Sequence, residues 1–165
     1  MRLFAGLFAL TSAAASVMLG AGLARTMQTQ RSPKQHQFLS GKVPHELPDG
    51  FYEGSADVNT GSWKGKTFRA TDRRGANIFE KDGARSAQFP FQYYTGPGLQ
   101  DPEIEVLKID YDIPENPRWL RFILDEVVEV DQGQLLGKVH VRIVPGLPFS
   151  LAYFRLEKAP VPAVA

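Results

Sequence analysis

The chain contains no cysteine, and this absence excludes several kinds of site at once. Without thiols there can be no disulfide bond, no thiolate zinc site and no cysteine nucleophile. Cysteine content therefore does not indicate whether the protein resides in an oxidising or a reducing compartment. The stability of the fold must come from packing alone.

A clear excess of charge of either sign is also missing. Lys and Arg number 19, Asp and Glu number 18, and the formal net charge is +1 at pH 7. A nucleic-acid-binding protein usually carries a clear basic excess, so no nucleic-acid partner is predicted. The 165 residues, 43% of them hydrophobic, fit one modest globular domain with an N-terminal addition.

The sequence motifs of common enzymes are absent: there is no Gly-x-Ser-x-Gly elbow, P-loop or dinucleotide fingerprint. The three histidines, His36, His45 and His140, show no metal-ligand spacing, so neither a metal nor a cofactor is predicted. His140 shares a polar strand face with Lys138 and Arg142, and we expect its side chain to be solvated there. The alternative, a role in a polar pocket or as a haem ligand, requires that face to be interior.

Three carboxylates stand near the middle of the chain, Asp110, Asp112 and Asp125. Asp110 and Asp112 share one face of an expected strand, roughly 6.6 to 7 Å apart. That arrangement fits paired acid and base roles or a cation site, and an exposed acidic strand face explains it as well. Asp125 ends an expected helix, where it organises a turn. We therefore expect no catalytic residues, although enzyme chemistry is not excluded.

Charge is entirely lacking between Leu3 and Ala24, where the sequence reads LFAGLFALTSAAASVMLGAGLA between Arg2 and Arg25. This run resembles a secretory signal peptide with cleavage after Ala24, and its length also suits a membrane-spanning helix. Both readings stay open. A retained anchor would put the domain on the cytoplasmic side by its flanking charges. Export or outward anchoring is favoured, which predicts a location in the bacterial periplasm or inner membrane.

The rest of the chain divides by composition. Residues 25–44 are polar without an apolar period and predict a linker, and the folded domain should span 45–158. The Pro- and Ala-rich tail, 159–165, should fray. Within the domain, turn residues separate eight segments rich in β-branched and aromatic residues. The predicted strands are 50–58, 62–70, 76–81, 87–94, 103–112, 125–130, 134–143 and 149–158.

These strands predict an all-β fold. In QLLGKVHVRI the face of Leu135, Val139 and Ile143 should form core, and such one-sided antiparallel strands satisfy their edges best by closing into an eight-stranded barrel. A sandwich is the alternative. One short helix is expected over 114–124, with Asn116 as its N-cap.

Aromatic residues are the remaining signal, at 11% of the chain. In a small barrel they line a cavity for an apolar ligand or fill a solid core. The aromatic residues predicted to contact a ligand are Trp63, Phe68, Phe89, Phe91, Tyr93 and Tyr111.

The motif Gly61-Ser62-Trp63, within an eight-stranded barrel, resembles the signature of the calycins, the superfamily of lipocalins and fatty-acid-binding proteins. The resemblance implies that Trp63 closes one barrel end and that Arg155, from the last strand, stacks on it. The motif follows a strand here, whereas in lipocalins it opens the first one. The run from Gly61 to Gly65 also resembles nitrobindin-type haem barrels, but Thr67 stands where they have a further glycine.

The pattern Trp-x-Gly-Lys-x-Phe, with Asp-Glu-Val and Leu-Gly-Lys later in the chain, is similar to a group of bacterial exported proteins and implies no activity. Together these features predict an exported or membrane-anchored monomeric barrel that binds a lipid or other apolar small molecule without catalysis. It would contact the membrane through residues 3–24. The alternatives are an acid/base isomerase or hydrolase in the barrel cavity and a structural envelope module with a filled core.

Overall fold

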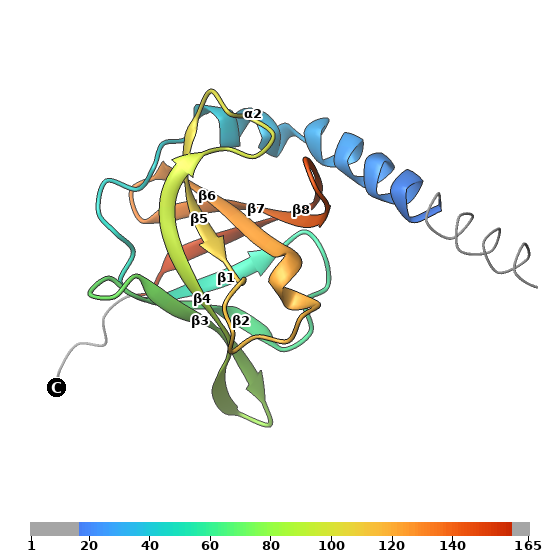
Figure 1. Cartoon of the computed structure of the whole chain (residues 1–165). Helices are drawn as coiled ribbons and strands as arrows, with labels where there is room; N and C mark the ends of the chain where they lie inside the picture. Colours follow the sequence, from blue (N-terminus) through green and yellow to red (C-terminus); the bar gives the residue numbers. More distant parts are fainter. Residues whose placement is uncertain (1–16, 160–165) are drawn as a thin grey trace, which may run out of the picture.

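The computed structural model describes residues 17–159, which form a closed antiparallel barrel of eight strands in sequence order (Figure 1). The strands are β1 (Gly50–Ala56), β2 (Trp63–Arg69), β3 (Arg74–Lys81), β4 (Ala84–Pro97), β5 (Glu105–Asp110), β6 (Ile123–Asp131), β7 (Gln134–Val144) and β8 (Leu147–Lys158). Pairing of β1 with β8 closes the barrel. The predicted eight-stranded antiparallel barrel is confirmed.

The hairpin turns have the residues that their backbone geometry requires. Between β3 and β4, Asp82 and Gly83 both have positive φ, 52° and 78°. This is the turn whose twist matches that of the flanking strands, and Asp-Gly is among its preferred pairs. Gly133 and Gly146 supply positive φ in the β6–β7 and β7–β8 turns.

Glycine is required at Gly65 by a close approach of two backbones. The β2–β3 register shifts between Trp63 and Gly65, and Gly65 has a φ of 137°. A Cβ atom there would lie 2.0 Å from the Tyr52 carbonyl oxygen of β1. The irregularity turns both Trp63 and Lys66, three positions apart, toward the barrel interior.

Aromatic rings fill much of the interior. Phe68 lies at the centre of a set of edge-to-face contacts, with ring centroids 5.3 Å from Tyr52 and 5.4 Å from both Phe91 and Tyr93. The buried cluster comprises Tyr52, Phe68, Phe91, Tyr93, Leu107, Ile109, Tyr111, Leu120, Val127, Leu135, Phe154 and Leu156.

A second layer covers the outside of β5–β8. It consists of a helix, described over residues 17–30, and α2 (Pro33–Ser40), which crosses the top of the barrel in Figure 1. Phe38 of α2 is fully buried against Val106, Val128, Leu136 and Tyr153.

The linker predicted over 25–44 is therefore wrong for much of its length, because these residues are helical and docked. One apolar side chain, Phe38, holds α2 to the barrel, and a single anchor produces no apolar period in the sequence. Residues 1–16 and 160–165, which include most of the predicted signal or anchor and nearly all of the tail, lie outside the described residues.

The helix predicted over 114–124 is reduced to one 3₁₀ turn, η1 (Leu120–Phe122). Asn116 does not cap it. Its side-chain amide donates instead to the carbonyl oxygens of Pro90 at 2.7 Å and Tyr111 at 2.9 Å. These bonds tie the β5–β6 connection to β4. Because the Asn116 side chain bonds to these carbonyl oxygens, it cannot cap a helix, and the helix predicted from the local sequence does not form.

Across residues 17–159, none of the helices combines the length and the apolar character that crossing a membrane requires.

Candidate functional site

A lysine lies inside the barrel. Lys66 of β2 is 3% exposed, and its ammonium group has three polar partners from different strands or their ends. Nζ lies 3.0 Å from Asp125 Oδ2, 2.9 Å from Asn77 Oδ1 and 2.5 Å from the Tyr111 hydroxyl. Lysine is almost never fully buried without such pairing, so the barrel has been built around this charge.

The partners of Lys66 also bind one another. Asn77 Nδ2 donates to the Tyr111 hydroxyl at 2.9 Å, and that hydroxyl donates to Asp125 Oδ2 at 3.3 Å. Trp63 Nε1 donates to Asn77 Oδ1 at 3.0 Å. We call these five residues, Trp63, Lys66, Asn77, Tyr111 and Asp125, the Lys66 cluster. Such a connected polar network fixes each member's orientation.

Aromatic faces surround the ammonium group. Lys66 Nζ lies 5.2 Å from the ring centroids of Tyr111 and Phe154, 5.5 Å from that of Phe91 and 5.7 Å from that of Trp63. Each ring is within the range at which its negative face attracts a cation. The rings make the surroundings of the ammonium group largely apolar, but their negative faces still stabilise its positive charge.

Burial shifts the acid–base properties of the cluster. The pKa of Lys66 is lowered, mainly because burial removes water from the ammonium group, while Asp125 opposes this by favouring the charged form. The pKa of Tyr111 is raised well above its ordinary value, mainly by burial and then by the Asp125 carboxylate. Tyr111 therefore remains a neutral hydroxyl at physiological pH.

One end of the barrel is less completely buried. The partly buried side chains against the interior core are Ala56, Trp63, Phe89, Ile123 and Val139. Ala56 ends β1, whereas Trp63 and Ile123 begin β2 and β6, so the meander places all three at the same end. We call this the open end.

Aromatic residues line the open end. Phe89 has a positive φ of 53°, a backbone strain that costs about 1 kcal/mol or more. Its ring packs edge-on against Phe79 at 5.7 Å and against Trp119 at 6.0 Å. Its carbonyl accepts from Asn77 Nδ2 at 3.3 Å, which links the strained residue to the Lys66 cluster.

The interior brings together six of the seven residues predicted from the sequence to contact a ligand. They are Trp63, Phe68, Phe89, Phe91, Tyr93 and Tyr111, which all belong to the interior core or pack against it. Lys66, Asn77 and Asp125 were not predicted from the sequence to lie in the interior. A signal existed for Lys66, because it stands two residues before Phe68 and strand alternation puts both on one face.

Arg155 lies on the opposite face of the barrel wall. Its guanidinium donates to Gln37 Oε1 of α2 at 2.8 Å, outside the barrel. The stacking of Arg155 on Trp63 that the calycin resemblance implies is therefore wrong. Lys66 places a cation over the Trp63 ring instead. Alternation along β8 explains the outcome, because Phe154 points inward and its neighbour must point outward.

The polar face of β7 is also buried, contrary to the expectation of a solvated His140. His140 and Lys138 are both 0% exposed, because the helix over residues 17–30, α2 and the β4–β5 connection cover this face through Thr29, Gln35 and residues 99–101. His140 Nε2 lies 3.0 Å from Glu126 Oε2, and its Nδ1 lies 3.3 Å from the Ser150 hydroxyl. The order Ser–His–Glu is that of a hydrolytic triad, but all three side chains are sealed from solvent, which leaves no access for a substrate.

The two aspartates considered as a catalytic pair belong to separate ion pairs. Asp110 Oδ1 lies 2.7 Å from Arg142, and Asp112 Oδ1 lies 2.6 Å from Arg121. Each carboxylate is therefore held by an arginine, and the two aspartates do not face each other as a pair. Among residues 17–159, no group of three His, Asp or Glu side chains is arranged to hold a metal ion.

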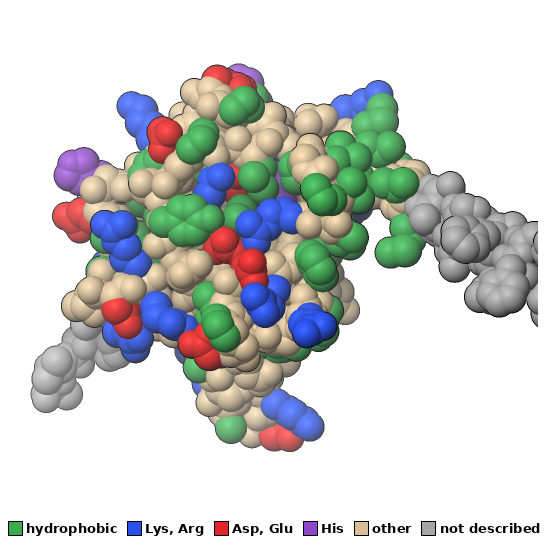
Figure 2. Space-filling view, in the orientation of Figure 1, with side chains coloured by type: hydrophobic (Ala, Val, Ile, Leu, Met, Phe, Trp, Pro, Cys, Tyr) green, Lys and Arg blue, Asp and Glu red, His purple; other side chains and the backbone are tan. Residues whose placement is uncertain are grey.

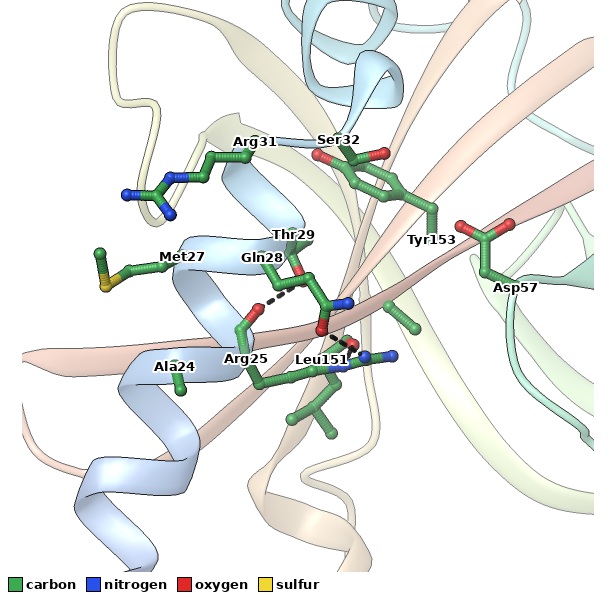
Figure 3. A pocket seen from close by; sticks show the side chains of 11 residues that line it. Ala24, Arg25, Met27, Gln28, Thr29, Arg31, Ser32, Asp57, Leu151 and Tyr153 are labelled. Atoms are coloured by element: carbon green, nitrogen blue, oxygen red, sulfur yellow. Dashed lines mark hydrogen bonds between the residues drawn. The ribbon is translucent and has the colours of Figure 1, made fainter.

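A surface groove of about 690 Å³ runs between the helix over residues 17–30 and β8 (Figure 3). Arg25 spans it, since Nε donates to the Leu151 carbonyl at 2.5 Å and Nη1 to Gln28 Oε1 at 2.8 Å. Thr29 donates to the Arg25 carbonyl at 2.9 Å. The Arg25–Leu151 bond, together with the bond that the Ser150 backbone N–H donates to Thr26 Oγ1 at 3.0 Å, holds the helix on the barrel, so the groove is a docking seam of the fold.

Comparison of the chain with protein-family models, with curated proteins and with solved structures found no match in any of the three.

Proposed function

We propose that the barrel binds a small apolar molecule that carries one neutral hydrogen-bonding group, a hydroxyl or a carbonyl, and that it does so without catalysis. The observation that carries the proposal is a buried lysine whose surroundings are otherwise aromatic, below the open end of the barrel. Small-molecule sites have this composition, a mostly apolar lining with a few placed polar groups.

The charge balance of the site supports a neutral ligand. Lys66 is already paired with Asp125 at 3.0 Å, so the cluster carries no net charge when both are ionised. A ligand carboxylate would add a second negative charge to a buried cluster whose one cation is already paired, which is costly. A hydroxyl or carbonyl group would instead share the donors of Lys66 and Asn77.

Entry must occur past aromatic side chains. The Trp63 ring packs edge-on against Phe154 at 6.1 Å, and Phe89 lies beside it at the open end. A ligand that reaches Lys66 would displace the Trp63 ring and change the environment of its indole. Trp63 fluorescence is therefore the expected reporter of binding, and the resemblance to ligand-carrying calycins remains part of the proposal.

The proposal is tested with the full-length protein and Nile red as an apolar fluorescent probe. Decanol and decanoic acid are then compared as competitors at neutral pH. We expect decanol to displace Nile red and decanoic acid to be at least about tenfold weaker, because of the added charge. Organic extraction and mass spectrometry of the purified protein should find a neutral apolar compound.

Variants of one strand provide the matched control. Lys66→Met should weaken decanol binding by about tenfold, as expected for a lost hydrogen bond to a charged group. Lys64→Met, the same substitution at an exposed position of β2 that pairs with Glu80, should leave it unchanged. If neither competitor nor Nile red binds, the proposal fails and the filled-core structural module is the remaining interpretation.

A further inference from the structure

Large apolar side chains are exposed around the open end of the barrel and the adjoining helix. We call six of them the apolar platform: Val17, Met18, Trp119, Phe122, Ile143 and Leu147, which are between 39% and 71% exposed. They come from the helix over residues 17–30, from the β5–β6 connection and from the β7–β8 hairpin. Figure 2 shows apolar side chains at the upper right of the barrel, next to the grey N-terminal trace.

The helix and the hairpin share an apolar groove of about 500 Å³. Met18 and Leu19 line one side, and Val141, Ile143 and Phe149 line the other. Gly22 brings the helix close, because a Cβ there would lie 2.9 Å from the Phe149 ring. An apolar groove of this kind, open to solvent, is typical of an interaction surface.

Arginine side chains connect the hairpin to the β5–β6 connection. Arg142 Nη2 lies 3.4 Å from the Arg121 carbonyl, and a surface hollow there is lined by Asp112, Arg118, Arg121, Phe122 and Arg142. Asp110 and Asp112 partly neutralise Arg142 and Arg121. The platform is thus bordered by cationic groups, a combination that suits the headgroup region of an anionic bilayer.

The sequence beyond the described helix indicates which surface covers the platform. Residues 3–16, which directly precede Val17, contain no charged residue. Val17 and Met18, which follow this apolar run in the chain, line or adjoin the groove shared with the hairpin. A lipid bilayer could contact the platform and also take up the uncharged residues 3–16, so one partner would cover both.

We propose that the apolar platform rests on the surface of an anionic lipid bilayer, so that the β7–β8 hairpin and η1 sit at the interface. The open end of the barrel, which these two connections share with the β1–β2 and β3–β4 connections, then lies beside the lipid. This docking does not rest on the proposed ligand, since a barrel with a filled core would dock in the same way. Where the barrel does bind an apolar molecule, docking gives a direct route between bilayer and barrel.

The absence of cysteine makes the test direct, because single cysteines can be introduced without competing thiols. Full-length Ile143→Cys and Gln132→Cys are each labelled with nitrobenzoxadiazole and reconstituted with equimolar phosphatidylcholine and phosphatidylglycerol vesicles. Gln132, exposed in the β6–β7 turn, marks the opposite end of the barrel. We expect a severalfold brighter, blue-shifted probe at 143 and a water-like probe at 132.

A second labelled position guards against a local effect of the hairpin substitution. Phe122→Cys, from the other part of the platform, should respond as Ile143→Cys does. Water-like probes at 143 and 122 in vesicles would overturn the proposal, as would equal responses at 143 and 132. A probe at 143 that brightens with protein concentration in the absence of vesicles would assign the platform to a second copy of the chain and also overturn it.

Discussion

Lys66 and Asp125 face each other inside the barrel, with Nζ and Oδ2 3.0 Å apart and each side chain 4% exposed. They reach this contact from strands on different sides of the barrel, β2 and β6. The pair is the only charged contact among the interior partners described for Lys66, and aromatic rings surround it. Removing one member leaves the other as an uncompensated buried charge.

Lys66→Met is expected to lower the free energy of unfolding by about 3–5 kcal/mol, because Asp125 is then left unpaired in the interior. The double variant Lys66→Met/Asp125→Leu should recover most of that loss, since both charges are gone. Urea denaturation of the three proteins measures the difference. A double variant as unstable as the single one would show that the cost comes from packing instead.

The buried tyrosines should make the fold sensitive to alkali. Burial raises the pKa of Tyr93 to about 12 from 10.0, and raises that of Tyr111 as well. Above pH 10 the unfolded chain releases these protons more readily, so their stabilising contribution is present below about pH 10 and is lost as the pH rises through the folded values.

The measurement is the free energy of unfolding by urea from pH 9 to pH 12, for wild type and for Tyr93→Phe. The stability of the wild type should fall more steeply above about pH 10 than that of the variant. Lys66 acts in the opposite sense, because its lowered pKa adds stability as the pH rises toward its ordinary value of 10.5. Parallel curves for the two proteins would contradict the role assigned to Tyr93.

Gly65→Ala should destabilise the barrel through contact as well as through backbone conformation. The added Cβ would meet the Tyr52 carbonyl oxygen at 2.0 Å, and neither backbone can move far in a closed barrel. Gly61→Ala is the matched control, because Gly61 also has positive φ, at 61°, and open space around it.

The control should cost about 1–2 kcal/mol from backbone strain alone. Gly65→Ala should cost at least about 1–3 kcal/mol beyond that, from overpacking and from a φ of 137° that alanine adopts less readily than 61°. Thermal or urea denaturation compares the two. Equal costs would mean that strand β1 yields locally and that the close approach does not constrain residue 65.

Phe38→Ala tests whether α2 is an integral part of the domain. The fully buried Phe38 ring packs on Val128, Leu136 and Tyr153, so its loss should cost about 3–5 kcal/mol. Leu39→Ala, one residue later on the exposed side of α2, should change stability by about 0.5 kcal/mol or less. Similar effects of both substitutions would show that α2 contributes little to the stability of the barrel.

Local patterns in the sequence predicted the strands well. Turn residues such as Asp82-Gly83 and the strand pattern act over a few residues, so the eight strands and their antiparallel order could be read in advance. Alternation failed at the end of QLLGKVHVRI, where Ile143, expected in the core, is 53% exposed because the β7–β8 register shifts after Val139. The aromatic residues expected in the interior lie there for the same reason, because strand alternation assigns each side chain to a face.

Only the tertiary structure decided which polar residues became buried. Alternation identified the face of β7 that carries Lys138 and His140 but did not indicate that two helices cover it. Likewise, a hydrophobic period cannot reveal α2, which is attached by one buried phenylalanine and by the polar bonds of Gln35 and Gln37. Nor can it reveal the bonds of Asn116 that replace a helix cap.

The Lys66 cluster shows the same division. Lys66, Asn77 and Asp125 are ordinary polar residues in their local sequence, and closure of the barrel brings them within hydrogen-bonding distance. The sequence by itself determined the barrel and its aromatic content, because both follow from short-range alternation and turn chemistry. Tertiary structure decided where the buried charge sits, because that position depends on contacts between strands far apart in the chain.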